Sequence, residues 1–351
     1  MPWPWRKPSP LDPLVICLDG PRLLYAHADG STGLPRRLLR CGSIEADPAR
    51  PADLARQLRA LAPPARPVVG LLALADCPLL QIEAPAVPPE ELKAAARWRI
   101  KDMVDGHIDD MTLDVLQVGD GRARGPKQAF VAVAPNRAIH AMAALCEAAG
   151  LQLQAIDIRE TAQRNLQSAL ARAAGRRERA SALLLRHGEQ CLLTITANDE
   201  LFYARRLDWH GALAPAAAAN SGFAPADLTQ PLGLLAGVDM PDIVDYGSDA
   251  ADPEPPAGDD TPRIVIELQR SLDLWDRCWP DLPLAAITLG TGEHGVALAA
   301  QLGRQLGQRV DVLDVAPAFR EVRAACGNDP ELQHRCLPLL GALLRNDTRP
   351  A

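Results

Sequence analysis

The chain has 351 residues, of which 48% are apolar, with a formal net charge of −7 and a pI near 5.6. This length and apolar content allow a large core and favour two domains or one large one. The acidic balance argues against a nucleic-acid-binding surface, because proteins that bind phosphate backbones gather Lys and Arg on one face. We therefore expect no nucleic-acid partner.

Lysine is scarce, since only four of the 37 basic residues are lysines and none of them follows a run of glycines. A phosphate-binding loop of the form G-x-x-x-x-G-K-[ST] is therefore absent from the sequence. The eight cysteines show no C-x-x-C spacing, so we expect reduced and mostly buried thiols. Cys326, His334 and Cys336 come nearest to a metal-binding group, but their spacing matches no common zinc pattern.

The amino terminus carries charge and several prolines but no apolar core segment, so it does not resemble a signal peptide. No stretch of the sequence approaches the roughly 20 apolar residues that a membrane-spanning helix needs. We expect a flexible N-terminus over residues 1–12 and a cytoplasmic protein that lies at a membrane only through its partners.

The first half of the chain begins with three apolar runs separated by turn residues, which predicts a three-stranded meander. Amphipathic stretches and further strand-like runs follow. The predicted strands or extended segments are 13–19, 22–28, 36–44, 67–74, 79–86, 111–118, 128–134 and 151–158, and the predicted helices are 51–61, 88–104, 136–149 and 160–173.

The second half repeats this order of elements. Its predicted strands are 182–186, 191–196, 201–207, 284–289 and 309–313, and its predicted helices are 262–279, 293–306 and 331–344. Two β-β-β-α-β-α halves indicate two facing α/β domains, as in actin-like and ribonuclease H-like proteins. We assign the domains to 13–175 and 180–345, with a mobile acidic, Pro-rich loop at about 249–260.

The tryptophans in helical segments receive different interpretations. Trp98 lies among basic residues, off the apolar stripe of its helix, where it is either a docking residue or a cover for a neighbouring helix. We favour packing for Trp98. Trp275 and Trp279 share a helix face with Leu268 and Leu272, which predicts that both belong to the core.

One segment carries a more specific pattern. Ile82-Glu83-Ala84-Pro85 is followed by an acidic helix start at Glu90-Glu91 and then by Trp98-Arg99-Ile100-Lys101-Asp102-Met103-Val104. This order of an I-E-x-P segment and a W-x-I-K-D helix resembles the PilM family, and especially its MshI branch. Further matches at 155–166 and 267–273 extend the resemblance over roughly residues 79–290.

The resemblance implies an actin-like fold with a small inserted subdomain, here about residues 79–156. It also implies a protein at the cytoplasmic face of the inner membrane, in type IV pilus or MSHA-type agglutinin biogenesis. Such proteins hold the cytoplasmic N-terminal tail of a PilN-type inner-membrane protein and help couple it to the assembly motor ATPase. The tail groove would lie between the first meander and the insert. The candidate partner-binding residues are Ile82, Trp98, Ile100 and Val104.

The same resemblance implies a site for ATP with Mg²⁺, built from two phosphate-binding hairpins and a glycine-rich adenosine loop. The matching positions are Asp19, Gly20 and Arg22 in the first hairpin, Gly188 in the second, and Gly290 and Gly292 in the loop. The family's first hairpin reads D-x-G-S followed by lysine, whereas here the serine and lysine are missing and Pro21 lacks an amide donor. The second turn lacks a preceding carboxylate. We therefore expect ATP binding to be weak or lost.

Two alternatives share the fold, an ATP-binding actin-like ATPase and a sugar-kinase-type phosphotransferase. A kinase needs a catalytic Asp, and both Asp157 and Asp314 end predicted strands. Strand-terminal Asp is more often a helix cap, as Asp157 would be for the helix at 160–173. The absence of a G-x-S-x-G elbow argues against a Ser or Cys hydrolase. The sequence thus favours a scaffold without catalytic residues.

Overall fold

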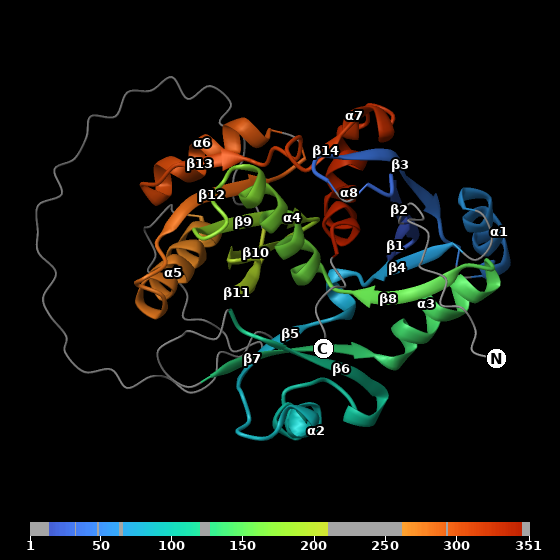
Figure 1. The fold of residues 1–351 in the computed structure, drawn as a ribbon, viewed down its shortest axis with the longest axis horizontal. Coiled ribbons are helices and arrows are strands. Elements are labelled where there is room, and N and C mark those ends of the chain that lie inside the picture. The colour runs from blue at the N-terminus through green and yellow to red at the C-terminus, as the bar shows by residue number, and fades with distance from the viewer. Residues whose placement is uncertain are drawn as a thin grey trace, which may run out of the picture.

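The computed structural model describes residues 14–31, 33–47, 49–62, 66–119, 127–209, 262–292 and 294–345. Two large β-sheets with helices between and around them form the body of the protein, and a small third sheet extends from it (Figure 1). The predicted flexible terminus at 1–12 and the predicted acidic loop at 249–260 lie outside the described residues. No helix within the described ranges is both long and apolar enough to cross a bilayer.

The first sheet has six strands in the order β14-β3-β2-β1-β4-β8. β1, β2 and β3 form the predicted antiparallel meander, whereas β4 lies parallel to β1 and β8 parallel to β4. Helices α1 (Pro51–Leu61) and α3 (Asn136–Ala148) bury Leu58 and Met142 against its outer face. The strands are β1 (Leu14–Asp19), β2 (Arg22–Ala28), β3 (Arg36–Glu45), β4 (Pro67–Leu71), β8 (Gln152–Asp157) and β14 (Phe319–Arg320).

The second sheet repeats this topology in the order β11-β10-β9-β12-β13. A meander is again followed by two parallel strands, which confirms the repeat of architecture. Helices α5 (Arg263–Cys278) and α6 (Gly295–Leu306) cover one face, where Trp275 is fully buried and Trp279 packs beside it. The strands are β9 (Ala180–His187), β10 (Gln190–Ala197), β11 (Glu200–Asp208), β12 (Leu284–Gly290) and β13 (Val310–Val312).

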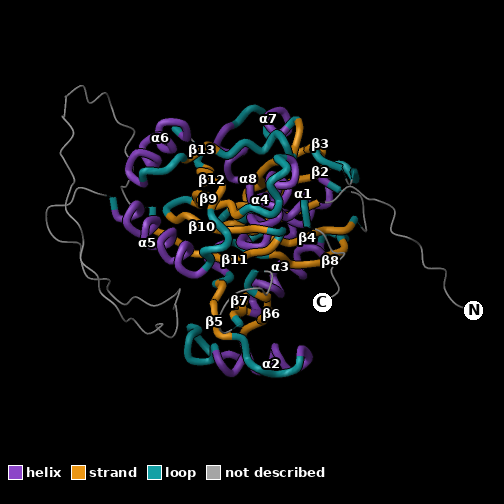
Figure 2. The backbone as a smooth tube through the Cα atoms, turned by 60° about the vertical axis from the view of Figure 1, so that its left-hand side comes forward, coloured by secondary structure: helices purple, strands orange, loops and turns teal. Residues whose placement is uncertain are grey.

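The small sheet contains β5 (Leu79–Glu83), β7 (Gln128–Pro135) and β6 (Met111–Gln117), in that order across the sheet. Together with α2 (Pro89–Arg99) it lies below the two large sheets in Figure 2. Two short 3₁₀ turns, η1 (Leu74–Asp76) and η2 (Ile108–Asp110), precede β5 and β6. The predicted insert over 79–156 also includes α3 and β8, which the structure joins to the first sheet.

Helix α2 is shorter than predicted. It ends at Arg99, where the sequence pattern predicts helix to Val104. Ile100 caps it, and the chain then turns through Asp105 and Gly106, which has a φ of 103°. Asp and Gly are weak helix formers, so the helical hydrogen bonds end here although the apolar stripe of the sequence continues.

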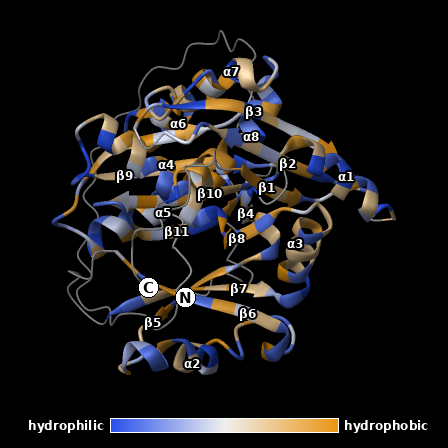
Figure 3. Ribbon diagram, turned by 45° about the vertical axis from the view of Figure 1, so that its right-hand side comes forward, coloured by the Kyte–Doolittle hydropathy of each residue, from blue (hydrophilic) through white to orange (hydrophobic). Residues whose placement is uncertain are grey.

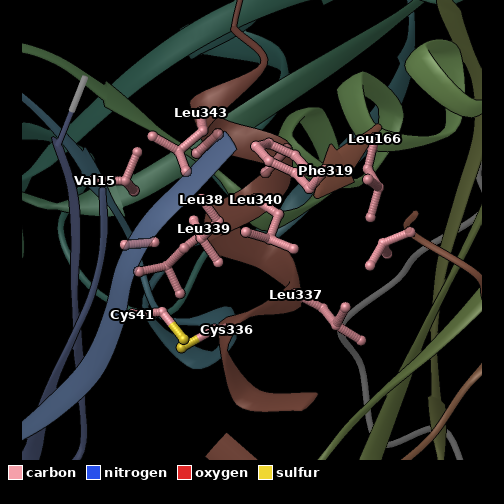
Figure 4. Packing of buried hydrophobic residues seen from close by; sticks show 14 of the residues in the cluster. Val15, Leu38, Cys41, Leu166, Phe319, Cys336, Leu337, Leu339, Leu340 and Leu343 are labelled. Carbon is pink, nitrogen blue, oxygen red and sulfur yellow. The ribbon is translucent and has the colours of Figure 1, made fainter. Parts of the chain in front are cut away.

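Helices α4 (Arg159–Ala173) and α8 (Pro330–Leu343) pack against each other between the two large sheets. Figure 4 shows Leu337, Leu340 and Leu343 of α8 among Phe319 and Leu166, and Figure 3 shows the apolar residues concentrated on the central strands. The short elements β14 and α7 (Val322–Ala325), which precede α8, were not predicted. Both are too short to show a period in the sequence.

The opposite side of α4 is polar and still buried. The amide nitrogen of Gln163 lies 2.9 Å from the Leu183 carbonyl oxygen and 3.0 Å from that of Leu192. The hydroxyl of Thr194 donates to Oε1 of Gln167 over 2.5 Å. These bonds replace water for the amide nitrogen of Gln163 and for the Gln167 amide, and they fix α4 to the second sheet.

The expectation of reduced thiols is wrong for one pair of cysteines. Cys41 on β3 and Cys326, which follows α7, form a disulfide although they are 285 residues apart in sequence. Five of the six free cysteines are buried, and only Cys278 is exposed. No spacing rule could indicate this pair, because β3 and the end of α7 meet only in the folded protein.

A substitution at Gly341 tests the contact between α4 and α8. A Cβ atom at Gly341 would lie 2.0 Å from the carbonyl oxygen of Ala162, which is backbone and cannot move aside. We expect Gly341→Ala to lower the free energy of unfolding by about 3 kcal/mol or more, although Ala normally favours a helix over Gly. Gly33→Ala is the control, because no atom lies within 4 Å of its added Cβ. Equal urea midpoints for the two variants would contradict the prediction.

Candidate functional site

Two equivalent hairpin turns and one loop carry the predicted nucleotide residues. The β1–β2 turn contains Asp19 and Gly20, and the β9–β10 turn contains Gly188. Both glycines have positive φ angles, 58° and 64°, which glycine adopts without steric cost. Gly290 is the last residue of β12, and Gly292 lies in the loop that follows it. A Cβ atom on Gly292 would lie 3.6 Å from the His334 ring, so this loop lies beside the start of α8.

Arg159, the first residue of α4, connects the first turn to the interior. Its side chain is 4% exposed, and Nη2 lies 3.6 Å from Oδ2 of Asp19 and 3.2 Å from Sγ of Cys17. Its Nε donates to the carbonyl oxygen of Leu72 over 3.1 Å. Asp19 itself is about half exposed, at 49%. A buried guanidinium is therefore already the counter-charge of the carboxylate that would face a metal ion.

Two histidines stand at the second turn. Nε2 of His334 donates to the Arg186 carbonyl oxygen over 2.9 Å, whereas Nδ1 of His334 and Nε2 of His187 are buried without a hydrogen-bond partner among the described residues. Burial, followed by the positive charge of Arg159, holds the pKa of His187 well below its usual range. Burial also lowers the pKa of His334. The imidazoles are thus kept neutral beside several positive charges.

A second buried ion pair joins the second sheet to the beginning of the small sheet. Nη2 of Arg206 lies 3.0 Å from Oε1 of Glu160, and the same nitrogen donates to the Cys77 carbonyl oxygen. Glu160 is 1% exposed, and its Oε2 has no hydrogen-bond partner among the described residues. A small hollow adjoins this pair, lined by Pro78, Leu79, Glu160, Leu192, Ala204, Arg205 and Arg206.

The expectation that Trp98 packs against a neighbouring helix is wrong. The Trp98 side chain on α2 is 76% exposed, and Nζ of Lys101 lies 5.6 Å from its ring centroid. Ile82 and Ile100, by contrast, belong to the core between α2 and the small sheet, and Val104 is partly buried against it. Of the four predicted partner-binding residues, only Trp98 therefore offers a large exposed side chain.

The remaining predicted positions have local roles. Arg22 is exposed and lies opposite Asp19 in the β1–β2 register. A Cβ atom on Gly290 would lie 2.6 Å from Cδ1 of Leu185, so this glycine allows close packing in the second sheet. Asp157 accepts hydrogen bonds from the Ile158 amide over 2.9 Å and from the Thr161 hydroxyl. We expected Asp157 to be the N-cap of α4, but the N-cap is the next residue, Ile158. Asp314 accepts from the Ala316 amide over 2.9 Å in an exposed turn.

Sequence reasoning missed the charged residues that the structure gathers around the turns, namely Arg159, Glu160 and Arg206, and it did not connect His334 with the second turn. A signal for two of them was present, because Arg159 and Glu160 follow strand β8 after Ile158 and begin a helix that is buried on most sides. Charged residues at such a position need buried partners. Among the described residues, no three His, Cys, Asp or Glu side chains are grouped as metal ligands would be.

No protein-family model matches the sequence, and no curated protein matches it. Among solved structures, the chain is similar to a chain of the PilM–PilN type IV pilus biogenesis complex, with 19% identity and a TM-score of 0.61. That match covers 95% of this chain and 99% of the other. The expected α/β, actin-like fold is thus confirmed by the repeated topology and by a match over nearly the whole chain.

Two weaker matches were also found. The cytoplasmic domain of EpsL, an inner-membrane component of the type II secretion system of Vibrio cholerae, matches with 17% identity and a TM-score of 0.39, over 56% of this chain and 71% of its own. A Bacteroides thetaiotaomicron protein with an actin-like ATPase fold and unknown function matches with 10% identity and a TM-score of 0.46, over 90% and 95% of the two chains.

The two histidines predict how stability depends on pH. The pKa values of both histidines in the folded protein lie below the usual value of 6.5. At a pH between the folded-state pKa and 6.5, the unfolded chain therefore binds more protons than the folded one. The free energy of unfolding must then fall as the pH falls, by up to about 1.4 kcal/mol per pH unit for each histidine. We expect urea unfolding to show a loss of stability from about pH 7.5 to about pH 5.5.

The variant that carries both His187→Gln and His334→Gln should lose much of this pH dependence. His140→Gln is the control, since His140 is exposed on α3. If the double variant keeps the full slope of the wild-type protein, carboxylates rather than these histidines cause the pH dependence.

Proposed function

We propose that this protein is a cytoplasmic scaffold of type IV pilus or MSHA-type agglutinin biogenesis. Its role is to hold the cytoplasmic N-terminal tail of a PilN-type inner-membrane protein, and so to lie at the inner membrane through that partner. The observation that carries the proposal is the match of almost the whole chain to a chain of a PilM–PilN complex. The I-E-x-P and W-x-I-K-D segments at residues 82–104 support the same family independently of the fold. The assembly motor ATPase is a further proposed partner.

The small sheet is the proposed tail-binding element, acting with the first meander. Its α2 surface presents Trp98, the most exposed aromatic side chain of the described residues. A large aromatic ring with few rotatable bonds can bury much apolar area on binding at a low entropic cost. Ile82, Ile100 and Val104 would then support this surface from beneath, because they pack in the core that holds α2 to the sheet.

We further propose that the nucleotide site is degenerate. The carboxylate of Asp19 faces the buried Arg159, and Pro21 supplies no amide to a phosphate. A Mg²⁺ ion at Asp19 would meet the guanidinium as a like charge. The residues therefore do not fit Mg-ATP in the manner that the fold implies, and the scaffold role does not require it.

The alternative is a protein that still binds ATP. One observation favours it: Arg159 and Arg206 contribute positive charge near His187, and such surroundings attract an anion. Binding through these residues would use side-chain charge in place of the missing lysine and serine. A sugar-kinase-type activity would need a catalytic Asp as well, and Asp314 is engaged in a local turn.

Tail binding can be measured directly. We expect a fluorescent peptide from the cytoplasmic N-terminus of the PilN-type protein encoded by the neighbouring gene to bind the full chain. Trp98→Ala should weaken this binding about tenfold or more. Trp98→Ala should change the free energy of unfolding by no more than about 0.5 kcal/mol, because the side chain is exposed. The control is Val296→Ala, which removes a side chain of similar exposure from α6, 77% against 76%. Absence of binding to the wild-type protein would refute the scaffold proposal.

Calorimetry with Mg-ATP tests the nucleotide site. We expect no binding tighter than about 10 μM, which corresponds to about −7 kcal/mol. Tighter binding that Asp19→Asn abolishes would instead support the ATP-binding alternative. Tighter binding that survives Asp19→Asn would also contradict the proposal, and would point to the arginines as the nucleotide contacts.

A further inference from the structure

A hollow of about 90 Å³ lies where α4 ends against the second sheet. Its walls come from the last turn of α4, the chain that follows it, and the first residues of β9 and β12. α4 is 15 residues long, so this end lies roughly 20 Å from Arg159 and the phosphate-type turns. The hollow is therefore separate from the site described above.

The floor of the hollow is apolar and is built mainly from small side chains. Ala180, Ala182, Ala285 and Ala286 line it together with Leu183. Alanine fills less space than the leucines and valines usual in strands, so the surface between α4 and β12 is left hollowed. The hollow therefore suits apolar side chains of limited size from outside.

The polar groups of the floor are already satisfied within the protein. Nε2 of Gln167 donates to the Ser181 carbonyl oxygen over 3.0 Å, and its Oε1 accepts from the Thr194 hydroxyl. The Ser181 hydroxyl lies 3.5 Å from that of Thr196. The floor thus offers little to a polar ligand and favours an apolar one.

The rim of the hollow is basic, and its arginines divide into two kinds. Arg172 and Arg177 lie 3.1 Å and 2.6 Å from the carboxylate of Asp199. Arg176 and Arg179 line the hollow, are exposed, and have no acidic partner within the part of the chain that the structure describes. The turn that carries them is ordered by backbone hydrogen bonds from Arg176 to Ala171 and from Arg179 to Arg176. The backbone that carries the two positive charges is therefore ordered beside the hollow.

We infer that this hollow, defined by Ala171, Arg176, Arg179 and the alanine floor, is a docking site for an acidic segment of a partner protein. Aliphatic side chains of the segment enter the hollow, and neighbouring carboxylates pair with Arg176 and Arg179. Charge complementarity selects the occupant, because two arginines without acidic partners beside an apolar floor match an apolar segment flanked by Asp or Glu. This surface is distinct from the proposed tail-binding surface at Trp98, so the protein would engage two partner segments at once.

The test uses the full chain and a fluorescein-labelled synthetic peptide in which leucines alternate with aspartates. We expect saturable binding by fluorescence anisotropy that weakens as salt is added, because exposed charge pairs are screened. Arg176→Glu combined with Arg179→Glu should weaken binding about tenfold or more. Ala171→Leu, which fills the hollow from the face of α4, should also weaken it. A peptide with asparagine in place of aspartate should bind more weakly than the parent peptide.

The matched control reverses two other exposed arginines at α1, Arg50→Glu with Arg56→Glu, whose side chains are 71% and 77% exposed. It makes the same change of net charge far from the hollow, so its affinity for the peptide should stay near that of the wild type. The proposal is overturned if the wild-type protein does not bind the peptide, if the Arg176 and Arg179 reversal leaves affinity unchanged, or if the control weakens binding equally. Loss of PilN-type tail binding would not affect this result, because the two surfaces are tested with different peptides.

Discussion

The contact of α4 with α8 at Gly341 is the constraint on which the rest of the structure depends. The two helices occupy equivalent places in the two repeats, and each follows the last parallel strand of its sheet. They approach so closely that no side chain fits between Gly341 and the backbone of Ala162. The apolar side of α4 packs on α8, while its amides bond to the second sheet. Helix α4 thus fixes the position of the two large sheets relative to each other.

Helix α4 also places charged groups beside the turns, because it begins with Arg159 and Glu160. Each of these buried charges has a partner of opposite sign, Asp19 on the first sheet and Arg206 on the second. Buried charges without partners would be costly, so both pairs favour the arrangement seen here. A residue of the central helix therefore occupies the electrostatic role that a metal ion would have at Asp19. The first turn is thereby joined to α4.

The small sheet is fastened to the second sheet as well as to the first. Val118 and Phe130 share a hydrophobic cluster with Leu201 of β11, and the Gly119 amide donates to the Leu201 carbonyl oxygen over 2.7 Å. Gly119 is needed there, because a Cβ atom would lie 2.6 Å from the Phe202 ring. With its inner face occupied in this way, the small sheet presents α2 and Trp98 outward. Trp98 is therefore left 76% exposed on the side of α2 that faces away from the small sheet.

The sequence by itself determined the order of strands and helices, the repeat of the meander and the burial of Trp275, because local periodicity and turn residues encode each of them. It also carried the family resemblance at residues 82–104. Only the tertiary structure decided that Arg159 pairs with Asp19, that Cys41 pairs with Cys326, and that Trp98 is exposed. Each of these depends on which distant segments meet, and periodicity along one helix says which face is apolar without saying what covers the others. The end of α2 at Arg99 has a similar cause, since an apolar stripe can outlast the helical hydrogen bonds.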